Sequence, residues 1–312
     1  YDLPSLYRCR TGLICLNKRS LLTHGNPLGL ASAALWFKPS AESYTAVIES
    51  EDQGGNLFGQ VLHSTGDRSA RLNYVAADHQ EATSELCSLL DELNYKAGEM
   101  GALNVLAELE ESSPIFEVLR RAGFIVYGWE TAWKLPRKTT VHLEDSQGWV
   151  IASPADEPQL RTLYQSLAPP VVQAAEAYSN GGTRRLIHRE NEEIVAYIES
   201  SAGPGGLYLR PLVHPSVMDS SVLLGELVEQ FKDLGQPVYL QVRSYQAWLL
   251  DALESIGGEV AAHFTLLVKH LAVQQRNGVI ITNRKLVDNR QAEPSAPIAT
   301  NLVVEDPPSQ QS

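Results

Sequence analysis

The chain has few cysteines and no long apolar run. Its three cysteines, Cys9, Cys15 and Cys87, have no paired spacing, and no histidine near the first two completes a zinc set. An odd number of cysteines without a framework is typical of a reducing compartment. We therefore expect free thiols that are buried or half-buried, and no metal site.

No stretch approaches the ~18 apolar residues of a membrane span, and no signal peptide is visible, so we expect a cytoplasmic protein.

Basic residues are also in deficit. The chain has 25 Lys and Arg against 37 Asp and Glu, which gives a formal net charge of -12 and a pI near 5.2. A nucleic-acid binder needs an electropositive surface to release counterions from phosphates, and binding to an anionic membrane needs one too. Both kinds of partner are therefore excluded. The length of 312 residues, with 44% hydrophobic and 20% charged content, indicates a globular protein of two domains.

Several well-known catalytic motifs are missing. The chain contains no P-loop, dinucleotide fingerprint, HExxH or GxSxG motif. An acidic cluster of Glu108, Glu110 and Glu111 lies at the end of a predicted strand. One interpretation is an amine-binding patch or general base, and the other is a solvated acidic loop, the usual state of charge runs.

A long pattern occurs twice in the chain. Residues 102–135 and 237–271 each read as an apolar strand, a polar break, a short amphipathic helix, a glycine and a second apolar strand. A constant offset of 134 residues separates the matching leucines and glycines, which are Leu119 and Leu253, and Gly123 and Gly257. A repeat this long means two copies of a whole domain. We predict an N-terminal domain at 1–135, a linker at 136–148, a C-terminal domain at 149–273 and a flexible tail at 274–312.

Both halves show the same order of predicted elements. Alternating apolar residues predict an antiparallel meander, followed by a crossover helix to a parallel strand, a short helix and a closing antiparallel strand. In the first half these lie at 44–50, 57–64, 70–76, 78–100, 103–109, 116–122 and a last strand up to 135. In the second half they lie at 184–190, 193–200, 207–213, 220–234, 238–243, 245–256 and 259–270. Further elements are predicted at 2–8, 28–37, 149–153, 154–167 and 171–178.

These patterns predict a mixed α/β (α+β) fold. Each half would be a mixed, mostly antiparallel sheet flanked by helices. Pro211 is awkward within its strand and should lie at a bulge or an edge. Residues 11–30 are ambiguous and yield no clear element, apart from the strong turn signal at 25–27.

The order of elements resembles the GNAT acyltransferase fold (the GCN-five-related N-acetyltransferases). The stretches that carry the resemblance are FEVLRRAGF in the first half, and LYLRPLVHP, WLLDALESIGG and FTLLVKHL in the second. Val213-His214-Pro215 matches the V-x-P that often ends the family's third meander strand. The resemblance covers residues 28–135 and 149–271. It implies transfer of an acyl group, most simply acetyl, from acetyl-CoA to an amine.

In that family the pyrophosphate of acyl-CoA lies on a glycine-bearing loop between the third meander strand and the crossover helix. Glycines let backbone N–H groups approach a phosphate closely at the positive end of the helix. The first-half loop at 78–83 has no glycine, and residues 78–92 carry five acidic and no basic residues. The second-half loop at 215–222 also lacks glycine, but its serines are small. The resemblance thus places the acyl-CoA contacts in the second half, on Leu212, Val213, Ser220, Ser221 and Val222. An ordinary helix N-cap is the alternative.

The family's usual general acid, a tyrosine four residues before the helix-ending glycine, is replaced by leucine in both halves. The remaining candidates for an acid or base are His214, Tyr245 and Arg243. They end strands at the cleft where α/β sheets tend to bind ligands. The alternatives are a turn residue for His214 and packing or interface residues for the other two.

Two functions therefore stay open. The first is an acetyltransferase in which a strand-end N–H holds the carbonyl oxygen. The second is a GNAT-fold ligand-binding or interaction protein that has lost the phosphate loop. The acceptor and any association into oligomers are left open by the sequence.

Overall fold

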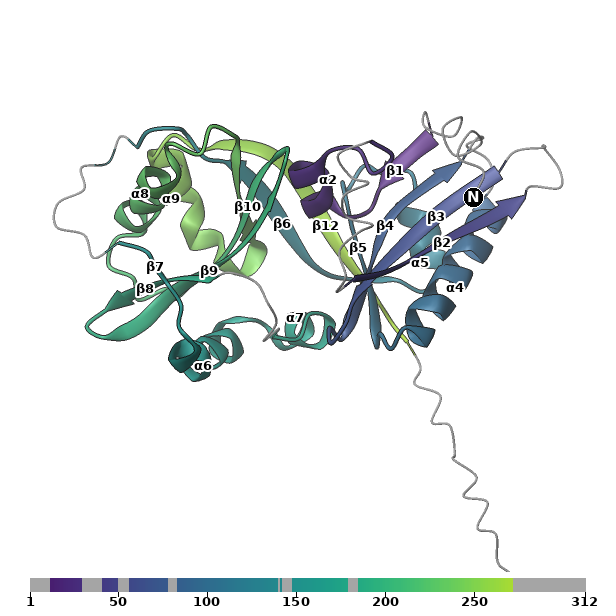
Figure 1. The fold of residues 1–312 in the computed structure, drawn as a ribbon, viewed down its shortest axis with the longest axis horizontal. Coiled ribbons are helices and arrows are strands. Elements are labelled where there is room, and N and C mark those ends of the chain that lie inside the picture. The colour runs from purple at the N-terminus through teal and green to yellow at the C-terminus, as the bar shows by residue number, and fades with distance from the viewer. Residues whose placement is uncertain are drawn as a thin grey trace, which may run out of the picture. The chain divides into compact units, whose positions relative to one another are not determined.

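The first half is built on an antiparallel meander of alternating apolar residues (Figure 1). Its elements are β2 (Ala41–Glu49), β3 (Asn56–Ser64), β4 (Ser69–Ala77), α4 (Thr83–Glu99), β5 (Asn104–Leu109), α5 (Phe116–Arg121) and β6 (Ile125–Lys134). As predicted, α4 carries the chain to β5, which runs parallel to β4. The helix buries Leu89, Leu90 and Leu93 completely. Gly59 on β3 allows this close approach, because a Cβ there would lie 2.7 Å from Leu93 Cδ1.

The second half repeats this order after two additional helices. Its elements are β7 (Val150–Ile151), η3 (Pro154–Asp156), α6 (Glu157–Leu167), α7 (Pro170–Ala175), β8 (Arg185–Glu190), β9 (Glu193–Gly203), β10 (Gly206–Val213), α8 (Ser220–Phe231), β11 (Val238–Arg243), η4 (Ser244–Leu249), α9 (Leu250–Ser255) and β12 (Glu259–His270). The turn between β8 and β9 has positive φ at Asn191 and Glu192, as a tight hairpin requires. The strand predicted at 149–153 shrinks to two residues, and the helix predicted at 245–256 begins as a 3₁₀ turn.

The computed structural model describes residues 12–29, 41–49, 56–77, 83–139, 141, 148–178 and 185–271. The helix predicted at 2–8, nearly all of the helix predicted at 28–37, and the tail at 274–312 lie outside these ranges, as do Cys9 and the loop residues 78–82. Within them, Cys15 is buried and Cys87 half-buried, and both are free thiols as expected. No helix in the described ranges is long and apolar enough to cross a membrane.

The two closing strands are exchanged between the halves. The sheet runs in the order β2-β3-β4-β5-β12-β6-β11-β10-β9-β8-β7, and Figure 1 shows β6 and β12 at its centre. We expected each half to close with its own last strand. Instead β12 pairs with β5 of the first half, and β6 pairs with β11 of the second. The mixed, mostly antiparallel sheet flanked by helices is confirmed, but it is continuous across both halves.

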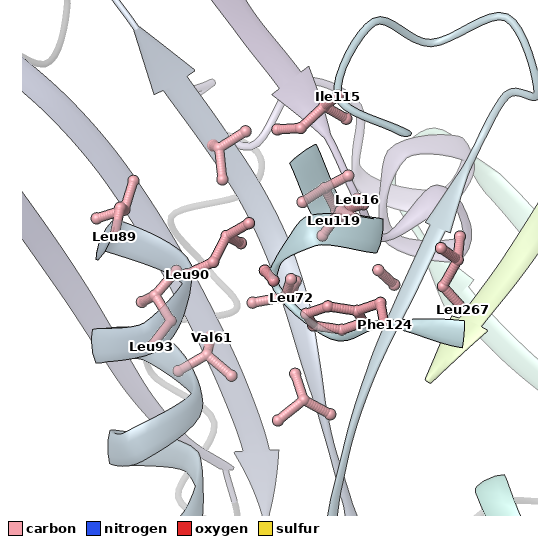
Figure 2. Close-up of a cluster of buried hydrophobic side chains, with 14 of the residues drawn as sticks. Leu16, Val61, Leu72, Leu89, Leu90, Leu93, Ile115, Leu119, Phe124 and Leu267 are labelled. Carbon is pink, nitrogen blue, oxygen red and sulfur yellow. The ribbon is translucent and has the colours of Figure 1, made fainter. Parts of the chain in front are cut away.

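The hydrophobic cores show the same exchange. The first core gathers the buried face of α4 and α5 and includes Leu267 from β12. The second includes Trp133 and Leu135 from the end of the first half. Figure 2 shows Leu267 beside Phe124 within the first core. Since each half needs a strand from the other to complete its core, the described residues of both halves form one compact unit. The boundaries proposed at 135 and 149 stay a prediction.

A short N-terminal segment joins both halves. Strand β1 (Leu13–Cys15) pairs with β4, and helix α2 (Lys18–His24) contacts β9 and β10. Asn17 caps α2, because its Oδ1 accepts a hydrogen bond of 3.1 Å from the Ser20 amide. The ambiguous residues 11–30 therefore contain an ordered link between the first meander and the second.

Candidate functional site

The gap between β4 and β5 in the first half is filled by the chain's own backbone. The two strands pair over only three residues each and then separate. Residues 13–16 enter the opening, where β1 pairs with β4. The Leu16 amide donates to the Asn73 carbonyl, and the Glu108 amide donates to the Leu16 carbonyl, both at 2.8 Å. The Leu16 side chain is 1% exposed and lies next to Leu119 (Figure 2), so this segment is part of the first core.

Glu108 holds this segment in place. Only 6% of the residue is exposed. Its Oε2 accepts a 3.0 Å hydrogen bond from the Lys18 amide, and its Oε1 accepts one of 2.6 Å from Arg71 Nη1. The predicted acidic cluster is therefore divided, because Glu110 and Glu111 are exposed while Glu108 faces inward and pairs with an arginine.

The corresponding gap in the second half is filled by one side chain. Strands β10 and β11 pair only up to Leu209 and Leu240. Pro211 lies beyond this point, where β10 is unpaired toward β11, so its missing N–H disturbs no ladder. The strand itself is an interior one, and Pro211 still pairs with Ile198 of β9, so neither the bulge nor the edge strand that we predicted is present at this residue. Gln246 from η4 is fully buried. Its Oε1 accepts from the Val213 amide at 2.9 Å, and its Nε2 donates to the Pro211 carbonyl at 3.0 Å.

The predicted phosphate-binding residues lie at the start of α8. Asp219 is the N-cap, and its Oδ1 accepts from the amides of Ser221 at 2.8 Å and Val222 at 3.1 Å. Ser220 is the first residue of the helix. A pyrophosphate would need these same N–H groups, so the Asp219 carboxylate and an anionic ligand compete for them. Asp219 is exposed, and its side chain is therefore free to turn toward solvent.

His214 takes part in a turn. Its amide donates to the Val195 carbonyl at 2.8 Å. Its Nδ1 lies 2.6 Å from Ser216 Oγ and accepts a 3.1 Å hydrogen bond from the Ser216 amide. This is the arrangement that the turn interpretation expects. A role for His214 as an acid or base stays a prediction.

Arg243 belongs to a buried cluster centred on Glu176, which follows α7. Glu176 accepts from Arg243 Nη2 at 2.8 Å, from Arg210 Nη1 at 3.1 Å and from the Tyr127 hydroxyl, and it lies 3.9 Å from Arg71 Nη2. Burial alone would raise the pKa of Glu176. The three guanidinium groups outweigh burial and hold this pKa well below its usual range. One ionised carboxylate thus joins residues of both halves, since Arg71 and Tyr127 come from the first.

The pKa of Glu130 on β6 is shifted in the opposite direction, upward. It is 3% exposed, accepts from the Gln241 and Tyr208 side chains, and lies 3.2 Å from Arg243 Nε. Burial raises the pKa of Glu130 to about 8. Arg243 opposes this rise without cancelling it, because its charge is shared with Glu176. Glu130 is therefore largely protonated at neutral pH.

Arg243 and Tyr245 line a small cavity beside the second-half gap. Its volume is about 40 Å³. The wall comprises residues of α6, α7, β9 and β10 together with the end of β11, among them Tyr164, Glu176, Tyr197, Arg210, Pro211 and Leu212. Of the residues predicted from the sequence, the structure therefore brings Leu212, Arg243 and Tyr245 together. The Val213 amide is hydrogen-bonded to Gln246, which fills the gap. Ser220, Ser221 and Val222 lie elsewhere, at the start of α8.

Sequence reasoning missed Glu176, Gln246 and Tyr197. One signal was present, because Arg71, Arg210 and Arg243 each stand in an otherwise uncharged strand. A charge in such a place needs a buried partner. Glu176 is the single acidic residue in the stretch 168–178, which is otherwise rich in small and apolar residues. This pattern indicates a carboxylate that could pair with the buried arginines.

Comparison with known proteins gives a fold. No family model and no curated protein matches the chain. A GCN5-related N-acetyltransferase from Sphaerobacter thermophilus superposes with a TM-score of 0.53 at 14% identity, over 86% of this chain and 92% of that one. A tandem GNAT protein from the clavulanic acid biosynthesis pathway gives a TM-score of 0.50 at 13% identity, over 88% of this chain and 97% of that one. The chain has the fold of the GCN5-related N-acetyltransferases.

Proposed function

We propose that the protein is an acyltransferase that moves an acetyl group from acetyl-CoA to an amine, in the gap between β10 and β11. The observation that carries this proposal is the hydrogen bond between the Val213 amide and Gln246 Oε1. It leaves a strand-end N–H that is held by a side chain and not by another strand's backbone. The first-half gap, by contrast, is filled by backbone hydrogen bonds from residues 13–16. The fold shared with N-acetyltransferases supports the class of reaction.

In the proposed reaction, the thioester carbonyl oxygen takes the place of Gln246 Oε1 and accepts from the Val213 amide. That N–H then stabilises the negative charge that develops on the oxygen. The amine nitrogen attacks the carbonyl carbon, the C–S bond breaks, and coenzyme A leaves as a thiolate. Burial raises the pKa of Tyr245, so its hydroxyl is protonated at neutral pH and donates the proton that the thiolate sulfur takes up. The proton lost by the attacking amine returns Tyr245 to its neutral form through solvent.

The pyrophosphate would bind at the start of α8. The N–H groups of Ser221 and Val222 face the Asp219 carboxylate at 2.8 and 3.1 Å, so that carboxylate must turn away first. Binding of acetyl-CoA would therefore displace two side chains, Gln246 and Asp219, which lowers the affinity in proportion to the hydrogen bonds that they give up.

These same two side chains favour a second candidate function. A protein in which Gln246 and Asp219 stay in place would keep the fold, would not bind acyl-CoA, and would use its cavity for another ligand. We retain this non-catalytic ligand-binding function as the alternative that the first experiment must exclude.

Calorimetric titration of acetyl-CoA separates the two functions. We expect micromolar binding at one site per chain, weakened at least about tenfold by Ser221→Glu, since a like charge would then face the pyrophosphate. The matched control is Ser84→Glu, which adds the same charge to an exposed position on the first turn of α4 and should leave the affinity unchanged. Absence of both heat and thermal stabilisation at millimolar acetyl-CoA would refute the acyltransferase and leave the binding protein.

A further inference from the structure

Two donors on the cavity beside the second-half gap have no acceptor among the described residues, and one of them, Arg243 Nη1, is fully buried. Arg243 is 5% exposed, and its Nη1 has no hydrogen-bond partner. Tyr197 is 4% exposed, and among the described residues none accepts from its hydroxyl. A buried donor without an acceptor costs about 1–3 kcal/mol, and native proteins leave few such groups unexplained. Both residues line the same cavity, so one acceptor group placed there would satisfy both.

The cavity has the size of a small polar group. Its volume of about 40 Å³ corresponds to roughly three water molecules by the usual measure. Val172 and Leu212 supply apolar wall, while the Tyr164 hydroxyl is engaged with the Glu176 carbonyl. The nitrogens of Arg210 are taken by Glu176 and Glu199. The groups left to bind a ligand are therefore donors, which select a ligand group rich in acceptors.

The charged residues that line the cavity belong to one network of ion pairs. Ion pairs connect four arginines with five glutamates in one network, namely Arg71, Arg185, Arg210 and Arg243 with Glu108, Glu130, Glu157, Glu176 and Glu199. With Glu130 protonated, because burial raises its pKa to about 8, the network is electrically balanced.

Arg19 does not line the cavity, but its positive charge acts on Arg71 and Arg210 of this network. It stands on α2, which packs against β10, and no described carboxylate forms an ion pair with its side chain. Burial and the nearby charges of Arg71 and Arg210 lower the pKa of Arg19 to about 10, so it is still charged at neutral pH. One more carboxylate in this region would balance it.

We infer that the cavity binds a carboxylate group through Arg243 Nη1 and the Tyr197 hydroxyl, and that the acceptor amine is therefore an amino acid or a similar amino carboxylate. The second clause rests on the proposed acyltransferase function, whereas the carboxylate site does not. Tyr245 borders the same cavity, which places the carboxylate of the acceptor next to the group that protonates the leaving thiolate.

Ring signals of tyrosine report binding directly and need no turnover. Protein with ¹³C-labelled tyrosine rings is titrated with glycine and β-alanine, and in parallel with their amides, glycinamide and β-alaninamide. We expect the carboxylates to shift the Tyr197 signal along a saturating curve, and to bind at least about tenfold more tightly than the amides. Equal affinity for acids and amides, or a Tyr197 signal that moves with neither, would refute the carboxylate site.

Tyr197→Phe identifies the hydroxyl as the binding group. Since no described residue accepts a hydrogen bond from that hydroxyl, its removal should leave folding intact, which thermal unfolding checks. We expect the variant to weaken glycine binding about tenfold, with Tyr245 as the reporter signal, and to leave glycinamide binding unchanged. The control Tyr95→Phe removes an exposed hydroxyl on α4 and should change neither affinity. Unaltered glycine binding in Tyr197→Phe would contradict the assignment.

Release of coenzyme A with the same four amines then connects the site to the reaction. We expect kcat/KM to be at least about tenfold higher for glycine and β-alanine than for their amides, and Tyr197→Phe to remove this preference. Carboxylate binding without any release of coenzyme A would disprove the proposed acyltransferase and leave the carboxylate site standing. Release of coenzyme A at equal rates with acids and amides would disprove the role of the carboxylate site in binding the acceptor and leave the acyltransferase standing.

Discussion

The side-chain carbonyl of Gln246 accepts a 2.9 Å hydrogen bond from the backbone amide of Val213, at the point where β10 and β11 have separated. We predict that Gln246→Ala lowers the free energy of unfolding by about 1–3 kcal/mol, because it leaves two buried backbone groups without partners. Urea unfolding measures this loss. The same variant should bind acetyl-CoA more tightly, by roughly fivefold or more, because the ligand no longer competes with a side chain for the Val213 amide.

The control for that experiment is Gln165→Ala on α6. Gln165 is exposed, so its loss should alter neither the unfolding free energy nor the affinity for acetyl-CoA. If Gln246→Ala lowers the stability but leaves acetyl-CoA binding unchanged, Gln246 is only a structural plug and the proposed cleft is misplaced.

Removing the negative charge at the start of α8 should also favour acetyl-CoA. Asparagine and aspartate are comparable N-caps, so Asp219→Asn should change the unfolding free energy little. We expect calorimetry to show an affinity for acetyl-CoA several-fold higher than in the wild type, because the repulsion of the pyrophosphate is removed. Asp251→Asn serves as the control, since Asp251 lies in the first turn of α9 rather than α8. A weaker affinity in Asp219→Asn would show that the pyrophosphate binds elsewhere.

The buried carboxylates make the unfolding free energy depend on pH. Glu176 and Glu199 stabilise the fold at higher pH, whereas Glu130 stabilises it at lower pH. The pKa values of Glu176 and Glu199 lie below their ordinary range, because arginines surround them. Their contribution is present above the unfolded pKa of about 4.3 and is lost as the pH falls further. The pKa of Glu130 is raised to about 8 by burial. Its contribution is full below about pH 4.3 and is lost as the pH rises toward 8.

We therefore predict that Glu130→Gln flattens the alkaline part of this profile. In the wild type, the titration of Glu130 should lower the unfolding free energy between about pH 5 and pH 8 by up to about 1.4 kcal/mol per pH unit, and the glutamine variant should lack this component. Urea unfolding at a series of pH values measures the difference. A difference between wild type and variant that does not change with pH would mean that Glu130 is ionised throughout.

The strand exchange shows how much of the fold the sequence could predict. The antiparallel meanders, both crossover helices and both closing strands were predicted from apolar periodicity, and the structure places them within a few residues of the expected bounds. The partner of each closing strand could not be predicted. Strands β6 and β12 belong to a repeat, so their patterns are alike and either suits β5 or β11. Periodicity determines which face of a strand is buried, and it leaves open which neighbour the strand pairs with.

The candidate site was harder to predict for a different reason. Arg243 and Tyr245 could be proposed because each lies at the end of a predicted strand. Glu176 and Gln246 act through contacts with residues 33 to 105 positions away, such as Val213 and Arg71, and such contacts leave no local pattern. The role of the segment at 13–16 could not be predicted for the same reason, because its backbone bridges β4 and β5. Every residue carries a backbone acceptor and every residue but proline carries a backbone donor, so such a bridge requires no particular side chains.

The docking of α2 on the second half gives the last prediction. Gly203 on β9 faces the end of α2, and a Cβ there would lie 2.3 Å from the Thr23 carbonyl oxygen. Because this obstacle is backbone, it cannot turn aside, and Gly203→Ala should lower the unfolding free energy by about 1–3 kcal/mol. Gly98→Ala is the matched control. A Cβ at Gly98 would lie 3.7 Å from Leu271 Cδ1, an ordinary contact, and the substitution should stabilise α4 by about 0.5–1 kcal/mol. Equal effects of the two substitutions would mean that α2 is not firmly docked on β9.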